Sequence, residues 1–332
     1  MTSVNNFGVE TTAEEVASSF RDQIIGKTIL ITGVSPNGLG AATAQALAKY
    51  SPANLIFTAR TASKASTVAD AIRTEHAKIK AQIHVVQVDL SDLESIRQAA
   101  ASIQKLTPVI DIMINNAGVM AIPEREVTKY GVEAHLATNF LGHFLLTTLL
   151  SPQLKAAGPK TRVVNIVSGG FYIQPFRFSD YNFDGGKDLP LEEQVDLDNA
   201  EKFGMGWVKD AGTGYVPFLA YSQSSTALML LAKGLNEGYA GEKITAVSAA
   251  PGVVLTELQR HLPSEFRNPN MTYKTASQGV ASFLVAALDP SLQDHPEAYI
   301  DDCRVKEVPK YASEALIARK LWTLAESWVK DT

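Results

Sequence analysis

Short apolar runs alternate with longer amphipathic stretches from residue 27 onward. The runs are rich in Ile, Leu and Val, as is typical of strands covered on both faces of a parallel sheet. The predicted strands span 27–32, 54–59, 83–88, 111–115, 162–167 and 243–250. The predicted helices lie between and after them, at 38–50, 64–80, 92–105, 127–156, 219–238 and 272–288. This alternation predicts an α/β fold with a doubly wound parallel sheet and right-handed crossovers.

The chain contains no internal repeat, low-complexity tract or Pro/Gly-rich linker, so we expect a single domain over 1–332 with its core at 26–300. A helical lead within 1–25 and a helix at 310–330 flank this core. A stretch rich in aromatic residues, 171–218, interrupts the strand pattern before the helix at 219–238 and is read as an insertion. A long irregular connection is usually a functional lid or binding loop. A surface decoration packed on its own aromatic residues is the alternative.

Composition excludes several classes of protein. The 332 residues carry 30 Lys and Arg against 35 Asp and Glu, a net charge of -5, so there is no electrostatic footprint for nucleic acid or anionic lipid. No apolar run is long enough to span a membrane, and the first residues lack the pattern of a secretory leader. The lone cysteine, Cys303, cannot form an intramolecular disulfide. Together these features predict a cytoplasmic protein.

A glycine-rich turn directly follows the first strand and precedes an alanine-rich helix. Glycines let the backbone approach a pyrophosphate, and the helix N-terminus offers free N–H groups and the positive end of the dipole. A tight turn without a ligand is the alternative, but the strand–turn–helix context favours a dinucleotide. The candidate cofactor residues in this turn are Gly33, Ser35, Asn37, Gly38 and Leu39.

The ends of the next three strands carry further candidate cofactor residues. The second strand is followed by Arg60 and has no acidic residue to repel a 2′-phosphate, so NADP(H) is preferred over NAD(H). A merely solvated Arg60 is the alternative. Asp89, followed by Leu90, is a candidate partner for the adenine amino group. The fourth strand leads into Asn116, Ala117 and Gly118, at the sheet edge where ligands of doubly wound sheets bind.

Seven motifs, in this order, resemble the short-chain dehydrogenase/reductase family. They are the glycine turn at 32–40, Asp89-Leu90, NNAG at 115–118, NFLGHF at 139–144, VNIVS at 164–168, Tyr221 in AYSQS and PGVVLT at 251–256. The phrases NNAGVM and TNFLGHFLLT are most similar to the retinol-dehydrogenase-like branch, particularly its fungal members. The resemblance implies a single Rossmann-like domain, which in this family is often part of an oligomer. The helices at 127–156 and 219–238 are candidate assembly surfaces, and packing of their apolar stripes in the core is the alternative.

The resemblance also implies roles for residues at matching positions. Asn139, Ser168 and Tyr221 match the family's catalytic Asn, Ser and Tyr. In PGVVLT, Val254 and Thr256 match residues that contact the nicotinamide carboxamide. The cofactor residues implied in this motif are Pro251, Gly252, Val254 and Thr256.

Two departures from the family pattern stand out. Four residues separate Gly33 from Gly38, where the family usually has three, which lengthens the turn. The family's catalytic lysine, four positions after the tyrosine, is replaced by Ser225. A lysine there would share a helix face with Tyr221 and lower the pKa of its phenol, which a serine cannot do. Oxidation of an alcohol needs tyrosinate, whereas reduction of a carbonyl needs the protonated phenol, so Ser225 favours reduction.

We therefore expect NADPH-dependent reduction of a ketone or aldehyde on a hydrophobic organic substrate, such as a secondary metabolite, with Tyr221 as proton donor and Ser168 bonded to the carbonyl oxygen. Ser225 also leaves open a non-redox isomerase, dehydratase or cyclase on the same scaffold. A regulatory nucleotide-binding protein is the weakest reading, because Asn139, Ser168 and Tyr221 are all retained. Ser225 itself is either natural, an engineered substitution, or a mark of lost hydride transfer.

Other residues with chemical potential are read as structural. The six histidines show no metal-ligand spacing, so no metal is expected. Ser168 lacks the GxSxG context of a hydrolase nucleophile. Lys233, twelve positions after Tyr221, lies about 18 Å along a helix and is too far to replace the missing lysine. Lys202 and Lys209, in the insertion, remain candidates for that replacement.

Overall fold

The computed structural model describes residues 7–76, 80–185, 188–210, 214–242, 244–261 and 273–330. Within these ranges one sheet has the strand order β3-β2-β1-β4-β5-β6-β7-β8. The strands are β1 (Thr28–Thr32), β2 (Asn54–Ala59), β3 (Gln82–Gln87), β4 (Ile112–Asn115), β5 (Arg162–Ile166), β6 (Ala246–Ala249), β7 (Tyr299–Asp301) and β8 (Arg304–Lys306). All neighbours pair in parallel except β7 and β8, which are antiparallel.

The winding of the chain creates a point of reversal beside β1. The chain runs outward from β1 to β2 and β3, then returns to place β4 on the other side of β1. In sheets of this kind ligands bind where the order reverses, outside the carboxyl ends of the strands. The ends of β1 and β4, at Thr32 and Asn115, therefore mark the expected site. The doubly wound, parallel-dominated fold predicted from the sequence is confirmed.

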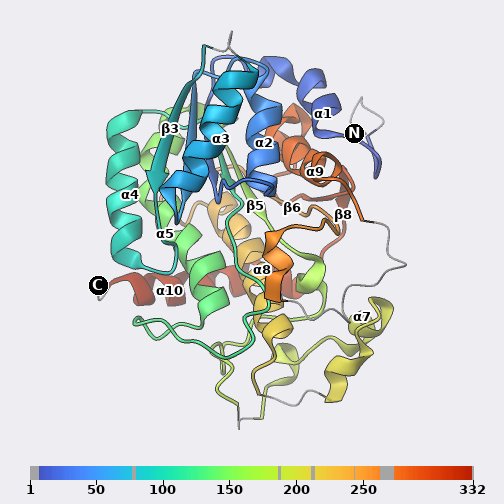
Figure 1. Cartoon of the computed structure of the whole chain (residues 1–332). Coiled ribbons are helices and arrows are strands. Elements are labelled where there is room, and N and C mark those ends of the chain that lie inside the picture. Colours follow the sequence, from blue (N-terminus) through green and yellow to red (C-terminus); the bar gives the residue numbers. More distant parts are fainter. Residues whose placement is uncertain are drawn as a thin grey trace.

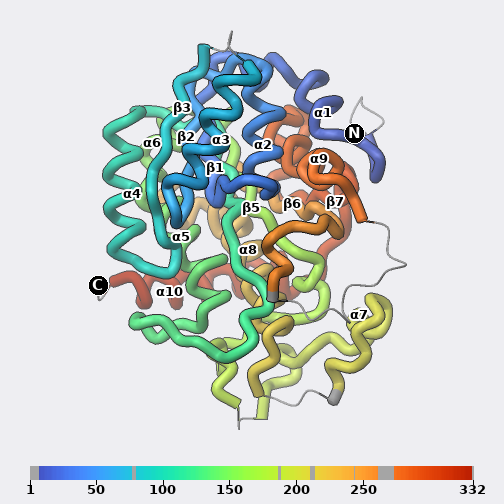
Figure 2. Tube along the Cα trace, viewed as in Figure 1, coloured from blue at the N-terminus to red at the C-terminus, as the bar shows by residue number. Residues whose placement is uncertain are grey.

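Helices cover both faces of the sheet (Figure 1). Successive strand residues point to opposite faces, so Ile29 and Ile31 join one buried cluster and Leu30 joins the other. The helices on the Ile29 face are α1 (Ala13–Ser19), α2 (Leu39–Ala48), α3 (Ala62–Glu75) and α9 (Ala276–Leu288). Those on the Leu30 face are α4 (Leu93–Leu106), α5 (Gly142–Leu149), α6 (Ser151–Ala156), α8 (Pro217–Asn236) and α10 (Ala315–Lys330). The Cα trace shows α1 against α2 and α9 (Figure 2).

Several element predictions are corrected. The single helix expected at 127–156 is three pieces, because Val127 pairs with Glu133 in a bridge and a π-helical turn, Leu136–Leu141, precedes α5. Leu150 then separates α5 from α6. Strands β7 and β8 were not predicted, since runs of three residues carry little periodicity. The part of the expected helix 64–80 at 77–79 lies outside the described residues.

The insertion, 171–218, is not structureless. It contains α7 (Leu197–Lys202) and short 3₁₀ turns, and α7 lies apart from the helices around the sheet (Figure 1). A separate apolar cluster packs the insertion against the start of α8 and includes Ile173, Phe183, Ala200, Val208, Leu219 and Ala220. Tyr215 donates a hydrogen bond from its hydroxyl to the backbone oxygen of Ile122, 2.8 Å away, and so ties the insertion to the segment after β4. The 3₁₀ turns here are Gly169–Tyr172, Leu191–Glu193 and Gly206–Asp210.

The C-terminal helix α10 packs on α8 and α5. Trp322 meets Phe144 of α5 edge to face, with ring centroids 4.9 Å apart. A Cβ at Gly234 of α8 would lie 2.6 Å from a Trp322 ring atom, so this glycine permits the close approach. Part of the helical surface considered for assembly is thus covered by the chain itself. The remaining 3₁₀ turns are Arg21–Gln23, Gly158–Lys160, Glu257–His261, Pro290–Asp294 and Lys310–Ala312.

Candidate active site

The glycine turn after β1 leaves no room for side chains at two positions. Gly33 has φ +73°, and a Cβ there would lie 2.7 Å from the Cα of Ala117. A Cβ at Gly40 would lie 2.7 Å from the Gly33 oxygen. Gly38 begins α2 without a side-chain cap, so no side chain covers the first N–H groups of the helix. The turn therefore has the backbone that an approaching pyrophosphate requires. Of the other residues predicted here, Asn37 is exposed, whereas Ser35 and Leu39 are half-buried.

The turn after β4 is bonded directly to the end of β1. The backbone N–H groups of Asn116 and Ala117 both donate to Thr32 Oγ1, each over 2.9 Å. The Asn116 side-chain Nδ2 also donates to the backbone oxygen of Thr32 over 2.8 Å. Gly118, next in the chain, is exposed and faces Asn139 Oδ1. We call Thr32, Gly33, Asn116 and Ala117 the cofactor turn.

The predicted contacts to the adenosine end follow β2 and β3. Arg60 is exposed and makes no hydrogen bond or ion pair within the described part of the chain. Asp89 accepts two hydrogen bonds at one oxygen, from the Ser91 N–H (2.9 Å) and hydroxyl (2.6 Å). Leu90 is buried, and its backbone oxygen lies where a Cβ on Gly142 would overlap it. Arg60 is thus available to an anion, while Leu90 has a packing role.

Tyr221 and Ser168 meet at the ends of α8 and β5. Pro217 starts α8 in its first turn, and Tyr221 follows one turn later. Ser168 comes just after β5 and caps a 3₁₀ turn by accepting from the Gly170 N–H over 3.1 Å. Burial raises the pKa of Tyr221 to about 12, and a hydrogen bond with the Ser168 side chain acts in the opposite direction. The phenol therefore stays protonated over the physiological pH range.

Ser225 lies on α8, four residues after Tyr221, and contacts Ser168. It is 2% exposed, and its hydroxyl oxygen accepts the backbone N–H of Ser168 over 3.3 Å. A short neutral side chain thus fills the position in which the family resemblance implies a lysine. We call Ser168, Tyr221 and Ser225 the hydroxyl cluster.

Asn139 lies in the π-helical turn and joins α8 to the segment after Gly118. Its Oδ1 accepts from the Val119 N–H over 2.8 Å, and its Nδ2 donates to the Val119 oxygen over 3.0 Å. The same Nδ2 donates to Ser224 Oγ over 2.9 Å. The Ser224 hydroxyl in turn donates to the backbone oxygen of Tyr221 over 2.7 Å. Every polar atom of the Asn139 side chain therefore has a partner in the scaffold, not at the Tyr221 hydroxyl.

The segment 251–256 lies at the same edge of the sheet, after β6. Gly252 is exposed with φ +69°, and Pro251 is half-buried. Val254 is buried and forms a parallel bridge with Lys274. The Thr256 hydroxyl accepts from the Leu258 N–H over 3.3 Å. The roles of these residues as cofactor contacts stay predictions.

Comparison with known proteins places this architecture in a family. A family model described as short chain dehydrogenase matches residues 27–182. Oxidoreductase fscI of Fusarium equiseti is 42% identical over 249 residues, which span 74% of this chain and 94% of that protein. The chain belongs to the short-chain dehydrogenase family. Retinol dehydrogenase 12 of Mus musculus is 33% identical over 306 residues, covering 91% and 86% of the two chains.

A solved structure supports the fold of this short-chain dehydrogenase. NADPH-bound carbonyl reductase from chicken fatty liver superposes with a TM-score of 0.60 at 20% identity, covering 86% of this chain and 95% of that one. At this identity the likeness concerns the Rossmann-like fold. Membership of the family makes the chain an oxidoreductase. Among the described residues, no helix is long and apolar enough to cross a membrane.

Sequence reasoning missed a buried acid–histidine pair beside the hydroxyl cluster. Glu133 Oε1 lies 2.7 Å from His135 Nδ1, and both side chains are fully buried. The Ile122 N–H donates to His135 Nε2 over 3.2 Å, so both ring nitrogens are engaged. The rings of His135 and Tyr221 lie 6.2 Å apart. The pair therefore lies next to the Tyr221 ring. In the sequence, only the spacing of Glu133 and His135 could have indicated it.

The lysines considered as replacements for the missing cation are engaged elsewhere or exposed. Lys233 forms ion pairs with Glu237 (2.8 Å) and Glu297 (3.0 Å). Lys202 donates to Asn199 Oδ1 on its own helix over 3.3 Å. Lys209 is exposed on the insertion.

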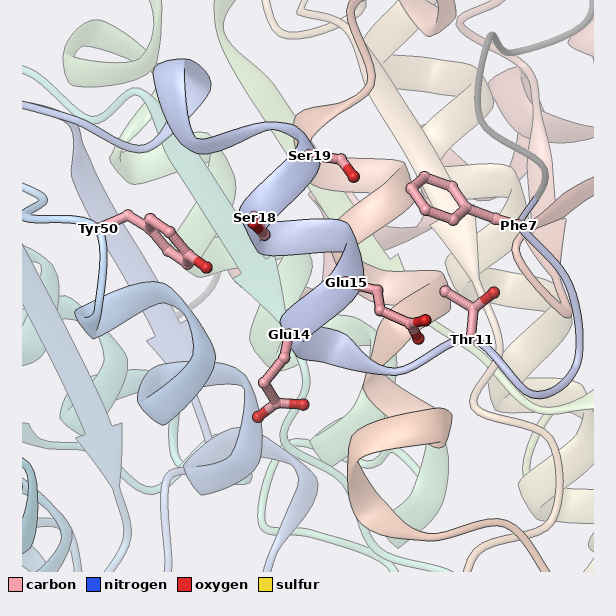
Figure 3. Close-up of a pocket in the computed structure, with 7 residues that line it drawn as sticks. All are labelled: Phe7, Thr11, Glu14, Glu15, Ser18, Ser19 and Tyr50. Carbon is pink, nitrogen blue, oxygen red and sulfur yellow. The ribbon is translucent and has the colours of Figure 1, made fainter.

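One surface depression lies away from the predicted site. It has a volume of about 660 Å³ and surrounds α1, with Phe7 and Tyr50 on opposite sides of the helix (Figure 3). The residues that line it are Phe7, Thr11, Glu14, Glu15, Ser18, Ser19 and Tyr50. None of these is a predicted site residue. Glu14 and Glu15 are bonded to Ser277 and Thr12, respectively, which indicates a packing role for this helix.

Proposed function

We propose that this short-chain dehydrogenase uses NADPH to reduce a carbonyl group of a hydrophobic organic substrate to an alcohol. The observation that carries the proposal is the hydroxyl cluster, in which Tyr221 has a pKa raised to about 12, Ser168 shares a hydrogen bond with it, and Ser225 supplies no positive charge. A phenol in this state is a proton donor. At pH 7 only about one molecule in 10⁵ would carry the tyrosinate that alcohol oxidation requires.

The cofactor turn and Arg60 support NADPH as the cofactor. Gly33 and Gly40 lack a Cβ and so let the turn after β1 pack directly against Asn116 and Ala117, and the start of α2 offers uncapped N–H groups to a pyrophosphate. The exposed guanidinium of Arg60 follows β2, where a 2′-phosphate would lie. NADPH, when bound here, supplies the hydride. The NADPH of the chicken carbonyl reductase structure is consistent with this assignment.

The chain's own contribution to reduction is orientation and one proton. Ser168 donates a hydrogen bond to the substrate carbonyl oxygen as negative charge develops on it. The carbonyl carbon receives the hydride, and the Tyr221 hydroxyl transfers its proton to the carbonyl oxygen, which yields the alcohol and a tyrosinate. Solvent then returns a proton to Tyr221. Ser225 holds the Ser168 backbone in place but does not stabilise the tyrosinate by charge.

Exposed apolar side chains support a hydrophobic substrate. Leu197, Phe203 and Trp207 of the insertion are 51%, 51% and 41% exposed. Val253 and Leu255, in the segment that carries Val254 and Thr256, are 41% and 55% exposed. Contiguous exposed apolar patches commonly mark ligand-binding sites. We infer that the insertion contributes apolar contacts to the substrate.

The test measures NADPH oxidation at 340 nm against a panel of apolar ketones and aldehydes, with product masses determined in parallel. A product two hydrogen atoms heavier than its substrate is the expected result. Product formed without NADPH oxidation, either of unchanged mass (an isomerase or cyclase) or lighter by one water molecule (a dehydratase), would instead overturn the proposal.

Cofactor choice is tested separately with Arg60→Ala and an exposed control, Arg21→Ala. Loss of one charge-assisted contact of about 1.5–3 kcal/mol should reduce the preference for NADPH over NADH by about 10- to 100-fold in Arg60→Ala alone. An unchanged preference would remove Arg60 from the cofactor site.

A further inference from the structure

His143, on α5, is fully buried between two hydrogen-bond partners and has no role in the proposed chemistry. Its Nδ1 lies 2.6 Å from the backbone oxygen of Asn139, and its Nε2 lies 2.8 Å from Thr32 Oγ1. A carbonyl oxygen can only accept, so Nδ1 carries the proton. Nε2 of the neutral ring is then an acceptor. The ring therefore has a defined tautomer that is set by the two groups on either side.

Thr32 fixes the other end of this arrangement. Its hydroxyl oxygen accepts the N–H groups of Asn116 and Ala117, which uses both lone pairs. Its single hydrogen is free to be donated, and His143 Nε2 is the nearer acceptor, since the Ile114 oxygen is 3.5 Å away. The hydrogen bonds therefore run in one direction, from the turn after β4 through Thr32 and His143 to the Asn139 oxygen.

The chain of hydrogen bonds continues into α8. The Asn139 side chain donates a hydrogen bond to the Ser224 hydroxyl, and this hydroxyl donates to the backbone oxygen of Tyr221. We propose that Thr32 and His143 are positioning residues that lock the cofactor turn to Asn139, so that the turn that binds the dinucleotide and the helix that carries Tyr221 keep one relative position. The proposal rests on the function proposed above, but it can be tested without turnover.

Burial supports this assignment. It lowers the pKa of His143 to about 4, with a smaller opposing effect of the Asn139 carbonyl. A second ring proton would point at Thr32 Oγ1, whose lone pairs are already occupied. The network is thus complete only with the neutral ring.

The experiment uses substitutions that separate the hydroxyl from the bulk of Thr32. Thr32→Val removes the hydroxyl, Thr32→Ser keeps it, and His143→Phe keeps a ring without nitrogens. Thr147→Val is the matched control, because Thr147 is also a buried threonine, one turn further along α5, with its hydroxyl bonded to Asn115 and Met113. The dissociation constant of NADPH is measured by fluorescence titration, kcat and KM by NADPH oxidation, and the histidine tautomers by ¹⁵N NMR.

We expect Thr32→Val and His143→Phe each to weaken NADPH binding about tenfold and to lower kcat with little change in the KM for the carbonyl. Thr32→Ser and Thr147→Val should stay within about twofold of the unsubstituted protein. The double variant should be no worse than the poorer single variant, since both break one network. NMR should show His143 protonated at Nδ1, and Thr32→Val should alter its signals.

Three results would overturn the proposal: a ring protonated at Nε2, strictly additive effects of the two substitutions, or equal losses in Thr32→Val and Thr147→Val. Failure of the proposed function looks different. If no carbonyl is reduced but the NADPH and NMR patterns hold, the reductase assignment falls and the positioning network stands. If NADPH does not bind, the tautomer and a double-mutant cycle on the free energy of unfolding decide the network alone.

Discussion

The cofactor turn and the hydroxyl cluster lie at the same edge of the sheet but are held in different ways. In the cofactor turn, Thr32 satisfies two backbone N–H groups and Gly33 leaves no space for a Cβ. In the hydroxyl cluster, Ser168, Tyr221 and Ser225 interact only through neutral hydroxyls and a backbone N–H. The first region is fixed by sterics and a saturated network. The second is fixed by a few hydrogen bonds, and none of the cations in the described part of the chain contributes to the pKa of Tyr221.

This difference predicts where substitutions will be tolerated. A saturated, tightly packed turn has no alternative arrangement of similar energy, so changes there should cost both stability and cofactor binding. A cluster of neutral hydroxyls can lose a member with little effect on folding, but its chemistry depends on one phenol. Activity and stability should therefore separate in the hydroxyl cluster and fall together in the cofactor turn.

Tyr221→Phe should have the largest effect. Removal of the proton donor is expected to lower kcat about 10³-fold. NADPH affinity and the melting temperature should change little, because the phenyl ring keeps its contacts. Tyr172→Phe is the control, since its hydroxyl is bonded to the Glu307 oxygen on the surface, and it should retain activity within about threefold. A similar loss in both variants would refute the role of Tyr221.

Gly33→Ala should break the cofactor turn. Alanine at φ +73° costs about 1–2 kcal/mol, and its Cβ would lie 2.7 Å from the Ala117 Cα, which adds about 1–3 kcal/mol. We expect a loss of about 3 kcal/mol in urea unfolding and NADPH binding weakened about 100-fold. Gly26→Ala is the matched control, with φ +72° and nothing within 4 Å of the new Cβ. Equal destabilisation of the two variants would show that backbone strain alone lowers the stability, and that the contact with Ala117 in the turn after β4 does not.

The two regions also differ in how well the sequence predicts them. Strand β2 was predicted to the residue, and β1, β3 and β4 to within one residue, because their apolar runs are bounded by turns. Gly33, Asn116 and Ala117 of the cofactor turn were predicted as cofactor residues because the strand ends meet at one edge of the sheet, whereas Thr32 was not. The resemblance supplied the residues of the hydroxyl cluster, whose roles remain predictions.

The polar network could not be predicted in the same way. Thr32 ends an apolar strand and His143 lies in an apolar helix, so nothing in the sequence indicates that the two side chains are hydrogen-bonded to each other. Their function depends on the distance between β1 and α5, which only packing determines. The break of the helix expected at 127–156 has a similar cause, since apolar residues on all sides of 136–150 conceal the π-helical turn.

Acid should reveal the saturated network through stability. The pKa of His143 is about 4 in the folded protein, and its ordinary value is 6.5. Between these pH values the imidazole is protonated in the unfolded chain but neutral in the folded protein. Stability is therefore full above about pH 6.5 and falls as the pH decreases toward 4, by about 3 kcal/mol for this group. Urea unfolding of the unsubstituted protein and His143→Phe between pH 4 and 7 measures it. The variant should lack this part of the pH dependence; parallel curves would contradict the assignment.

Ser225→Lys should have the smallest effect on reduction, and it tests directly whether the missing charge in the hydroxyl cluster favours reduction. A cation one helical turn from Tyr221 favours the tyrosinate and lowers the pKa of the phenol from about 12. Each unit of decrease raises the tyrosinate fraction tenfold at pH values below the pKa, so oxidation of the product alcohol with NADP⁺ at pH 9 should rise about tenfold or more. Reduction at pH 7 should change by less than about threefold, because the phenol is still protonated there. Ser225→Met adds a chain of related bulk without the charge at this position, which is 2% exposed, and controls for crowding. If the methionine variant gains oxidation as the lysine variant does, crowding and not charge governs the hydroxyl cluster, and the absent cation ceases to explain why this site favours reduction.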